Sequence, residues 1–419
     1  MLVFKFGGAS VKNADAVHNL GNIVKKYSNQ LVVVVSAMAK TTNALENVIY
    51  QYFNQSSQLK ESIKIVRDYH YSILKDLFPD DVHPVYNEVE KQFKSLEKKI
   101  SDPPGSNYDF EYDQIVCYGE LISTIIVSQY LSEQGINNRW IDIRDSLRTD
   151  QSFREAKVNW DLSRELVLNE FHFRNEKVVL TQGFIASAGD NKTTSLGREG
   201  SDYTAAILAY ILGAEMVIIW KDVPGVLNAD PKWFDNTILL NQLNYKDAIE
   251  LAYYGASVIH PKTIQPLKNK NINLYVKSFI HPDEPGTLIG NEDYDKLIPS
   301  FIFKMDQVLI SISSKDFSFI AEDNLELILG VFAKFGLRMN LMQNTAVSFQ
   351  VCINNDKTRI PSVVRELEYH FNVSWENGLE LITIRYYDED TIKRVLVNKD
   401  KILEQRSRTI IQMVVKDRG

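Results

Sequence analysis

The stretch Met1-Leu2-Val3-Phe4-Lys5-Phe6-Gly7-Gly8-Ala9-Ser10 decides the fold of this chain. Its apolar start predicts a short buried strand, and its two glycines predict a turn into a helix that begins at Ser10 or just after. Glycines let the backbone approach a ligand closely, and a helix N-terminus presents unpaired N–H groups that favour phosphate. Lys5 adds a mobile positive charge beside them. The stretch therefore indicates a phosphate-binding turn at the end of a parallel strand; a strand–turn–helix connection that binds nothing is the alternative.

Strand-like and helix-like segments alternate over the first two-thirds of the chain. The β-branched run Leu31–Val35 predicts a strand buried on both faces. Residues 44–105 carry helical apolar spacing in a highly charged background, which predicts a helical subregion. The alternation predicts an α/β fold over residues 1–290, in which helices sandwich a mostly parallel open sheet. The other expected elements are strands at 138–143, 178–185, 216–220 and 273–276 and helices at 113–130 and 201–212.

The pattern changes after the boundary loop His281–Gly286. The order of the next elements is βαββαβ, which predicts a small α/β sandwich within a C-terminal region at 300–419. A second unit at about 375–419 contains only an expected strand, helix and strand, and is truncated by comparison. The expected strands are 308–312, 339–342, 347–353, 381–386 and 409–415, and the expected helices are 325–335, 360–371 and 389–397.

Composition limits the classes of function. The net charge of −7 argues against a nucleic-acid binder, whose binding face normally shows as a basic excess. The two cysteines, Cys117 and Cys352, lie far apart without metal-ligand spacing, so we expect neither a disulfide framework nor a zinc site, and a cytoplasmic location. No stretch has the length and apolarity that we expect of a membrane span, and the N-terminus lacks a signal-peptide pattern.

Three further segments place chemistry-bearing groups at strand ends. Ser36–Asn43 follows a buried strand with hydroxyls and amides, although such residues also favour helix caps. Gly197–Asp202 places a guanidinium, a hydroxyl and a carboxylate at a helix start; Arg suits bidentate capture of a carboxylate, and Asp202 would orient a lysine or hold Mg²⁺. An N-cap beside a surface Arg is the alternative there. Trp220–Val226, followed by Asn228–Lys232, would hold a purine and ribose or form a plain Pro-Gly turn.

Together these segments resemble one family, the aspartate kinases of the amino-acid kinase superfamily. The family opening Lys-Phe-Gly-Gly-Thr-Ser matches Lys5–Ser10 with Ala9 in place of Thr. The family segment Thr-Thr-x-Leu-Gly-Arg-Gly-Gly-Ser-Asp matches Thr193–Asp202 with Glu199 in place of the first Gly after Arg. The resemblance spans about residues 1–290 and explains the C-terminal region as ACT-like. The other matching segments are Val34–Met38, Thr42-Asn43, Gly119-Glu120, Trp220–Val226, Ala229–Lys232, Tyr254–Pro261 and Pro285–Ile289.

The resemblance implies ATP-dependent phosphorylation of the β-carboxylate of L-aspartate to 4-phospho-L-aspartate. This reaction is the first step of the pathway to lysine, threonine and methionine. It implies ATP and Mg²⁺ as cofactors, without a dedicated metal site in the protein. The nucleophile is already ionised at neutral pH, so the reaction needs no general base. The ACT-like region implies a homodimer or higher homo-oligomer.

The resemblance also implies roles for single residues. Lys5 would contact the transferring phosphoryl group and Asp202 would orient Lys5. Arg198 would clamp a substrate carboxylate, while Glu120 would pair with the substrate ammonium. The remaining expected substrate-binding residues are Ser36, Thr42, Gly200 and Ser201, and the expected nucleotide-binding residues are Lys5, Gly7, Gly8, Ser10, Lys221, Asp222, Lys232, Ser257 and Val258.

The chain departs from the family pattern in three places. Lys221 and Leu227 replace the Thr and the aromatic residue that usually line the nucleotide site. Glu199 replaces a Gly beside the substrate clamp, and we expect it to point to solvent. Asp316–Ala321 replaces the Gly-rich turn that usually opens the effector-binding helix, which does not favour feedback by lysine or threonine.

Two alternatives to an aspartate kinase are a sibling amino-acid kinase and, from a different class, a protein without catalytic activity. A sibling kinase would act on glutamate or N-acetylglutamate, but a carboxylate at Glu120 favours a free ammonium group over an acetylated one. A non-catalytic amino-acid sensor would use a dead kinase scaffold. The retention of Lys5, Arg198 and Asp202 together argues against that sensor.

Overall fold

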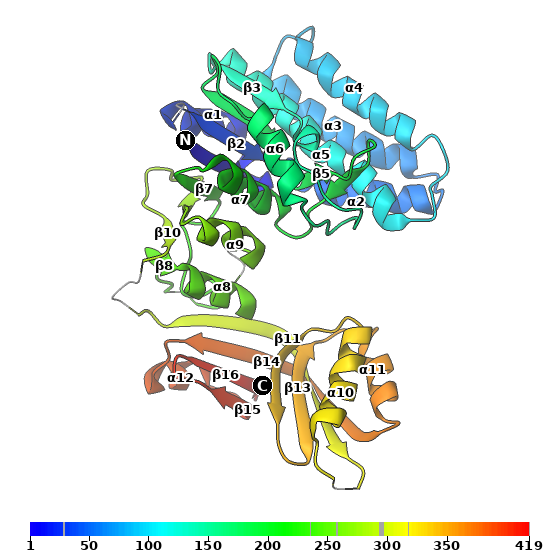
Figure 1. Ribbon diagram of the computed structural model, residues 1–419, viewed down its shortest axis with the longest axis vertical. Coiled ribbons are helices and arrows are strands. Elements are labelled where there is room, and N and C mark those ends of the chain that lie inside the picture. Colours follow the sequence, from blue (N-terminus) through cyan, green and yellow to red (C-terminus); the bar gives the residue numbers. More distant parts are fainter. Residues whose placement is uncertain (28–29, 235, 257–258, 293–296, 317, 419) are drawn as a thin grey trace. The chain divides into compact units, whose positions relative to one another are not determined.

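The computed structural model describes residues 1–27, 30–234, 236–256, 259–292, 297–316 and 318–418 (Figure 1). The chain divides into two compact units. The first comprises residues 1–226, 239–249 and 257–294, and the second comprises 227–238, 250–256 and 295–419. The expected boundaries at 1–290 and 300–419 placed residues 227–238 and 250–256 in the first domain, whereas in the structure they belong to the second unit. Residues 227–238 join the second unit in part because Phe234 packs on Phe301, with ring centroids 4.9 Å apart.

The first unit is built on an eight-stranded sheet, and its mostly parallel order confirms the predicted fold class. All neighbouring strands are parallel except β9 and β10, which pair antiparallel. In spatial order the strands are β3 (Asn138–Ile141), β4 (Val178–Gln182), β2 (Leu31–Val35), β1 (Leu2–Phe6), β7 (Met216–Lys221), β9 (Asn273–Ser278), β10 (Thr287–Gly290) and β8 (Gln242–Asn244).

Helices cover both faces of this sheet, as the buried central strands require (Figure 1). The first α-helix begins at Ala14 and not near Ser10, because Gly8–Val11 forms a 3₁₀ turn and the Asn13 side chain caps the helix. The helices are α1 (Ala14–Tyr27), α2 (Thr41–Phe53), α3 (Leu59–Leu77), α4 (Pro84–Lys99), α5 (Tyr108–Glu133), α6 (Trp160–Glu170), α7 (Gly200–Leu212), α8 (Tyr245–Tyr254, shared between the units) and α9 (Pro261–Asn269), with a hairpin of β5 (Ile185–Ser187) and β6 (Thr193–Ser195).

Helix α5 corrects one expectation. By length and composition it is long and apolar enough to cross a membrane, with a mean hydropathy of 1.3 over an 18-residue window. However, 78% of that window is buried inside the protein, as in the core helix of a soluble protein. Our expectation that no stretch has these properties was wrong, because α5 combines the length of a span with the apolarity of a core helix.

The second unit contains a six-stranded antiparallel sheet and, among its described residues, three helices in addition to the end of α8. Strand β15 was missed because its sequence, Lys-Asp-Lys-Ile-Leu-Glu-Gln-Arg, is mostly charged; it lies at the sheet edge, where charge prevents unwanted pairing. The expected helix at 360–371 ends at Leu367, because the long strand β14 begins at Phe371. In spatial order the strands are β12 (Met339–Asn344), β13 (Ser348–Asn354), β11 (Ser300–Ser314), β14 (Phe371–Arg385), β16 (Ile410–Asp417) and β15 (Lys399–Arg406), with helices α10 (Glu322–Lys334), α11 (Ile360–Leu367) and α12 (Glu389–Val395).

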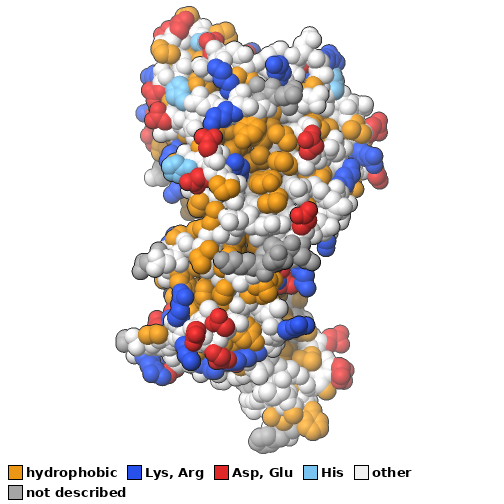
Figure 2. Space-filling view, turned by 90° about the vertical axis from the view of Figure 1, so that its left-hand side faces the viewer, with side chains coloured by type: hydrophobic (Ala, Val, Ile, Leu, Met, Phe, Trp, Pro, Cys, Tyr) orange, Lys and Arg blue, Asp and Glu red, His pale blue; other side chains and the backbone are white. Residues whose placement is uncertain are grey.

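The surface carries both signs of charge. Figure 2 shows one face, on which Lys and Arg side chains are interspersed with Asp and Glu instead of gathering into a single basic patch. Both cysteines are buried and free.

Candidate active site

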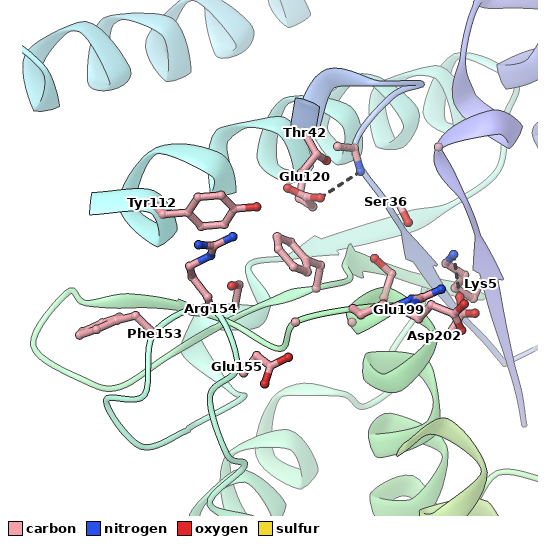
Figure 3. A pocket seen from close by; sticks show the side chains of 18 of the residues that line it. Lys5, Ser36, Thr42, Tyr112, Glu120, Phe153, Arg154, Glu155, Glu199 and Asp202 are labelled. Carbon is pink, nitrogen blue, oxygen red and sulfur yellow. Dashed lines mark hydrogen bonds and ion pairs between the residues drawn. The ribbon is translucent and has the colours of Figure 1, made fainter. Parts of the chain in front are cut away.

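The candidate site is a cavity of about 790 Å³ at the carboxyl ends of the central strands. The parallel register places Phe6 beside Val35 and Trp220, so the residues that follow β1, β2 and β7 meet at one edge of the sheet. Figure 3 shows Lys5 and Asp202 on one side of the cavity and Tyr112 and Arg154 on the other. The predicted residues that line it are Lys5, Gly8, Ser36, Thr42, Glu120, Arg198, Gly200, Ser201, Asp202 and Lys221.

Some predicted residues are not among those that line this cavity. Gly7 and Ser10 instead close the turn after β1, where the Ser10 amide donates to the Gly7 carbonyl at 2.9 Å. Asp222 follows β7 outside the lining, and Lys232 belongs to the second unit. Ser257 and Val258 lie outside the described residues.

Gly8 is required by packing. A Cβ atom there would lie 2.7 Å from the carbonyl oxygen of Ala39 and 2.8 Å from that of Ala37. The turn after β1 therefore contacts the loop after β2 at backbone distance, and only glycine permits this approach. The contact fixes the turn that directly follows Lys5 and the loop that contributes Ser36 to the cavity.

Two lysines share one buried carboxylate. Lys5 Nζ lies 2.7 Å from Asp202 Oδ1, and Lys221 Nζ lies 3.5 Å from Asp202 Oδ2. Burial alone would raise the pKa of Asp202, but the Lys5 and Lys221 ammonium groups hold it below its ordinary value. The carboxylate is therefore charged at neutral pH, and the three groups together carry one excess positive charge beside the cavity.

Glu120 on α5 presents a buried carboxyl to the same cavity. Its Oε1 accepts a long hydrogen bond of 3.4 Å from the Ala37 amide, and its Oε2 has no hydrogen-bond partner among the described residues. Burial raises its pKa to about 8, and the Ala37 amide opposes the shift. A buried carboxyl with an unused oxygen is suited to a cationic ligand.

Glu199 does not point away from the cavity. It lines the cavity, and its Oε2 is buried without a hydrogen-bond partner among the described residues. Its φ of 53° is left-handed, which allows this residue to precede α7 and turn inward. The expectation that it points to solvent was wrong, because it assumed an ordinary helix start. Arg198, its neighbour, is exposed.

Several lining residues were missed by the sequence analysis. The most informative is Arg154, in the loop between β3 and α6, which reaches the cavity beside Tyr112. Its loop is held by Asp113, a buried carboxylate that accepts hydrogen bonds from the amides of Arg154 and Ser195, both at 2.9 Å. Nothing in the local sequence marks these residues, because the contacts join positions 41 and 82 residues apart. The others are Asp109, Tyr112, Phe153, Glu155, Phe184 and Ser195.

Comparisons with known proteins agree with this geometry. A model described as the amino acid kinase family matches residues 1–278. Lysine-sensitive aspartokinase 3 of Escherichia coli (strain K12) is 30% identical over 397 residues, which cover 92% of this chain and 86% of that protein. A bifunctional aspartokinase/homoserine dehydrogenase 2 of Arabidopsis thaliana, a chloroplastic protein, is 28% identical over 390 residues, which cover 90% of this chain but only 42% of that longer protein.

The three-dimensional comparison leads to the same relative. The crystal structure of E. coli aspartokinase III in complex with aspartate and ADP superposes with a TM-score of 0.83 at 28% sequence identity. The match covers 99% of this chain and 96% of that one, so it includes both units. By family model, sequence and structure, this chain belongs to the amino acid kinase family and, within it, to the aspartokinases.

Proposed function

We propose that this chain transfers the γ-phosphoryl group of ATP to the β-carboxylate of L-aspartate, giving 4-phospho-L-aspartate and ADP. One observation carries the proposal: the buried Lys5–Asp202 ion pair lies in the same cavity as Glu120 and Arg198. A cation suited to a phosphoryl group and side chains suited to an amino acid therefore share one enclosure. The aspartokinase III structure that holds aspartate and ADP supports the same reaction.

The chemistry follows from charges. A β-carboxylate oxygen attacks the γ-phosphorus, the bond to the β–γ bridging oxygen breaks, and ADP leaves with that electron pair. The nucleophile is ionised at neutral pH, so catalysis rests on positioning two anions and neutralising their repulsion. Lys5 would lie on the transferring phosphoryl group. Asp202 is buried and ionised, and it would hold the Lys5 ammonium in place.

Substrate recognition would use the opposite charges of the amino acid. The Glu120 carboxylate would accept the ammonium group, and the Arg198 guanidinium would bind a carboxylate in its bidentate manner. Ser36, Thr42 and Ser201 would add hydroxyl donors, and Gly200 would allow close approach at the start of α7. An N-acetylated substrate would leave the buried Glu120 carboxyl without a cationic partner, which favours a free amino acid.

Nucleotide binding would use the excess positive charge near Lys5 and Lys221, together with the amides of Gly7 and Gly8. Among the described residues, no group of three or more His, Cys, Asp or Glu side chains could hold a metal ion. The donor set therefore fits an Mg²⁺ that arrives with ATP and is held by its phosphates, where it would neutralise phosphate charge. Ser10, Asp222 and Lys232 are further nucleotide contacts in this proposal.

The wider setting is also part of the proposal. The product would enter the synthesis of lysine, threonine and methionine, in the cytoplasm. The C-terminal unit would mediate a homodimer or a higher homo-oligomer as an ACT-like region. Neither nucleic acid nor a membrane is a proposed partner.

A hydroxamate trap tests the reaction directly. Hydroxylamine converts an acyl-phosphate into a stable hydroxamate, so the chain is incubated with MgATP and L-aspartate, L-glutamate or N-acetyl-L-glutamate in parallel. We expect aspartyl hydroxamate alone. Product with either glutamate compound but not with aspartate would assign a sibling kinase, and no product with any of the three would favour a sensor. Lys5→Ala is the inactive control and the exposed Lys12→Ala is its matched partner.

A further inference from the structure

The turn that follows β4 packs against the first turn of α7. A Cβ atom on Gly183 would lie 2.4 Å from Cβ of Ser201, and a Cβ atom on Gly200 would lie 2.8 Å from Cδ2 of the Phe184 ring. A glycine on each side of the contact lets the turn and the helix start meet at backbone distance. Phe184 therefore lies directly against the residue that begins α7, next to the Ser201 hydroxyl that we expect to bind the substrate.

The backbone of Phe184 is held from two directions. Its amide donates to Thr204 Oγ1 at 3.1 Å, and its carbonyl accepts from the Leu196 amide at 2.9 Å. Its φ of 71° is left-handed, a conformation that glycine adopts without strain and that a bulky residue rarely adopts. Strain of this kind persists where the surroundings enforce it, commonly at functional sites. A large aromatic side chain at such a position indicates that the ring itself is used.

The ring of Phe184 forms part of a rigid wall. Phe184 lines the same cavity as Glu120, Arg198 and Ser201. It also packs against the hydrophobic core of the first unit. Because a protein core is close-packed, the ring has little room to move away from a ligand in the cavity.

The two ends of the substrate would be bound close together. In the proposed function, Ser201 and Arg198 bind the α-carboxylate. The β-carboxylate attacks the phosphoryl group on Lys5, which Asp202 holds at 2.7 Å. Because Ser201 and Asp202 are adjacent in the first turn of α7, the carbon chain between the two carboxylates has to be short. The side chain of glutamate has one methylene more than that of aspartate, so it would have to bulge sideways between these fixed ends.

We propose that the Phe184 ring limits the side-chain length of the amino-acid substrate, so that the cavity accepts L-aspartate and excludes L-glutamate. The inference rests on the proposed function and deepens it by naming the residue that separates these two amino acids. Glu120 and Arg198 do not separate them, because aspartate and glutamate carry the same ammonium and α-carboxylate groups. The ring acts instead on the extra methylene, which it prevents from bulging towards the start of α7.

The experiment compares the two amino acids in the hydroxamate assay. Values of kcat/KM are measured with L-aspartate and with L-glutamate for wild type, Phe184→Leu and Phe184→Ala. One methylene in an apolar pocket changes kcat/KM by roughly 10- to 200-fold, so the ratio of glutamate to aspartate should rise by a factor in this range in Phe184→Ala. It should rise less in Phe184→Leu, because leucine keeps more of the volume. The rise should come from a larger kcat/KM for glutamate.

Two further variants separate specificity from folding. Phe153→Ala is the matched control: Phe153 lines the same cavity, but its ring packs on Phe110 at 5.1 Å, and Figure 3 shows it on the side away from Lys5 and Asp202. Its ratio of glutamate to aspartate should equal that of wild type. Phe184→Gly removes the ring together with the left-handed strain, so it should be at least as stable as Phe184→Ala and show at least as large a ratio.

The outcomes are distinguishable. A wild-type ratio in Phe184→Leu, Phe184→Ala and Phe184→Gly would overturn the role of Phe184 while the kinase assignment stands. An equal loss of kcat/KM with both amino acids, which a merely structural residue would cause, would overturn it as well. A wild-type protein that forms no aspartyl hydroxamate would overturn the proposed function and the inference with it.

Discussion

The Lys5 ammonium and the Asp202 carboxylate lie 2.7 Å apart, although their positions in the chain differ by 197. Both side chains are largely buried, with 11% and 2% of their surface exposed. Lys5 comes from the end of β1 and Asp202 from the first turn of α7, so the fold brings a cation and its counter-ion together at the carboxyl edge of the sheet.

The first prediction concerns this pair. Lys5→Ala should lower kcat by at least about 10²–10³, the usual effect of losing one preorganised charge donor, with a smaller change in KM for ATP. Asp202→Asn should lower kcat similarly and reduce the free energy of unfolding by about 3–5 kcal/mol, because it leaves two ammonium groups without their counter-ion. Near-native turnover of Lys5→Ala in the hydroxamate assay would contradict the assignment.

The second prediction compares two lysines that the sequence placed in the nucleotide site. Lys221 lines the cavity and pairs with Asp202, whereas Lys232 belongs to the second unit. Lys221→Met should raise KM for ATP by roughly 10- to 100-fold with little effect on KM for aspartate, since a charge-assisted phosphate contact is lost. Lys232→Met should have a smaller effect. Initial rates at varied ATP concentrations give the two KM values. A larger increase in KM for ATP in Lys232→Met than in Lys221→Met would show that the excess charge near Asp202 is not used for the nucleotide.

The third prediction concerns pH. Because burial raises the pKa of Glu120 to about 8, the carboxyl is mostly protonated at pH 7, whereas a substrate ammonium requires the charged form. Binding of aspartate at pH 7 should therefore release up to one proton, and kcat/KM for aspartate should rise as pH increases toward 8. Calorimetric titrations in two buffers of different ionisation enthalpy measure the release. Glu120→Gln should bind aspartate weakly and without releasing a proton. Proton release by this variant equal to that of wild type would contradict the role of Glu120 as the partner of the substrate ammonium.

The free energy of unfolding should depend on pH in the opposite direction to aspartate binding, because of the same residue. The folded pKa of Glu120 lies above its ordinary value, so its contribution to the free energy of unfolding is fully present below about pH 4.5 and is lost as pH rises through about 8. Glu120→Gln should therefore be the more stable protein at pH 8. Denaturation curves at pH 5 and pH 8 give the comparison.

The sequence predicted those parts of the site that local patterns determine. Lys5 follows an apolar run and Asp202 lies at a helix start, so strand ends and helix termini located both. Arg154 was missed because its position depends on a long-range bond to Asp113. Strands β8 and β10 were missed because three or four residues carry too little periodicity to be recognised.

The fourth prediction concerns the strained residue Glu199. Glu199→Gly should raise the free energy of unfolding by about 1 kcal/mol, because glycine accepts the φ of 53° without strain, and should lower KM for aspartate by removing a negative charge from the cavity. Glu199→Gln removes the charge and keeps the strain, so it should lower KM without the gain in stability. Equal KM values in all three proteins would show that Glu199 does not act on the substrate.

The last prediction concerns His70, which is fully buried in α3. Its Nδ1 lies 2.7 Å from the Val66 carbonyl, and its Nε2 has no hydrogen-bond partner among the described residues. Burial lowers the pKa of His70 to about 4, from an ordinary value of 6.5, and the Val66 carbonyl opposes the shift. The unfolded chain therefore binds a proton more tightly than the folded one. The resulting stability is present above pH 6.5 and is lost as pH falls toward 4.

His70→Leu removes this dependence and leaves a side chain of similar size in an apolar site. Relative to wild type, its free energy of unfolding should increase by roughly 2–3 kcal/mol between pH 7.5 and pH 4.5, which is the linkage expected of one buried imidazole. Denaturant titrations at several pH values measure the difference. His281→Leu, at an exposed position, is the control and its curve should run parallel to wild type. If the curve of free energy of unfolding against pH for His70→Leu also ran parallel to that of wild type, protonation of His70 would not contribute to the loss of stability at low pH.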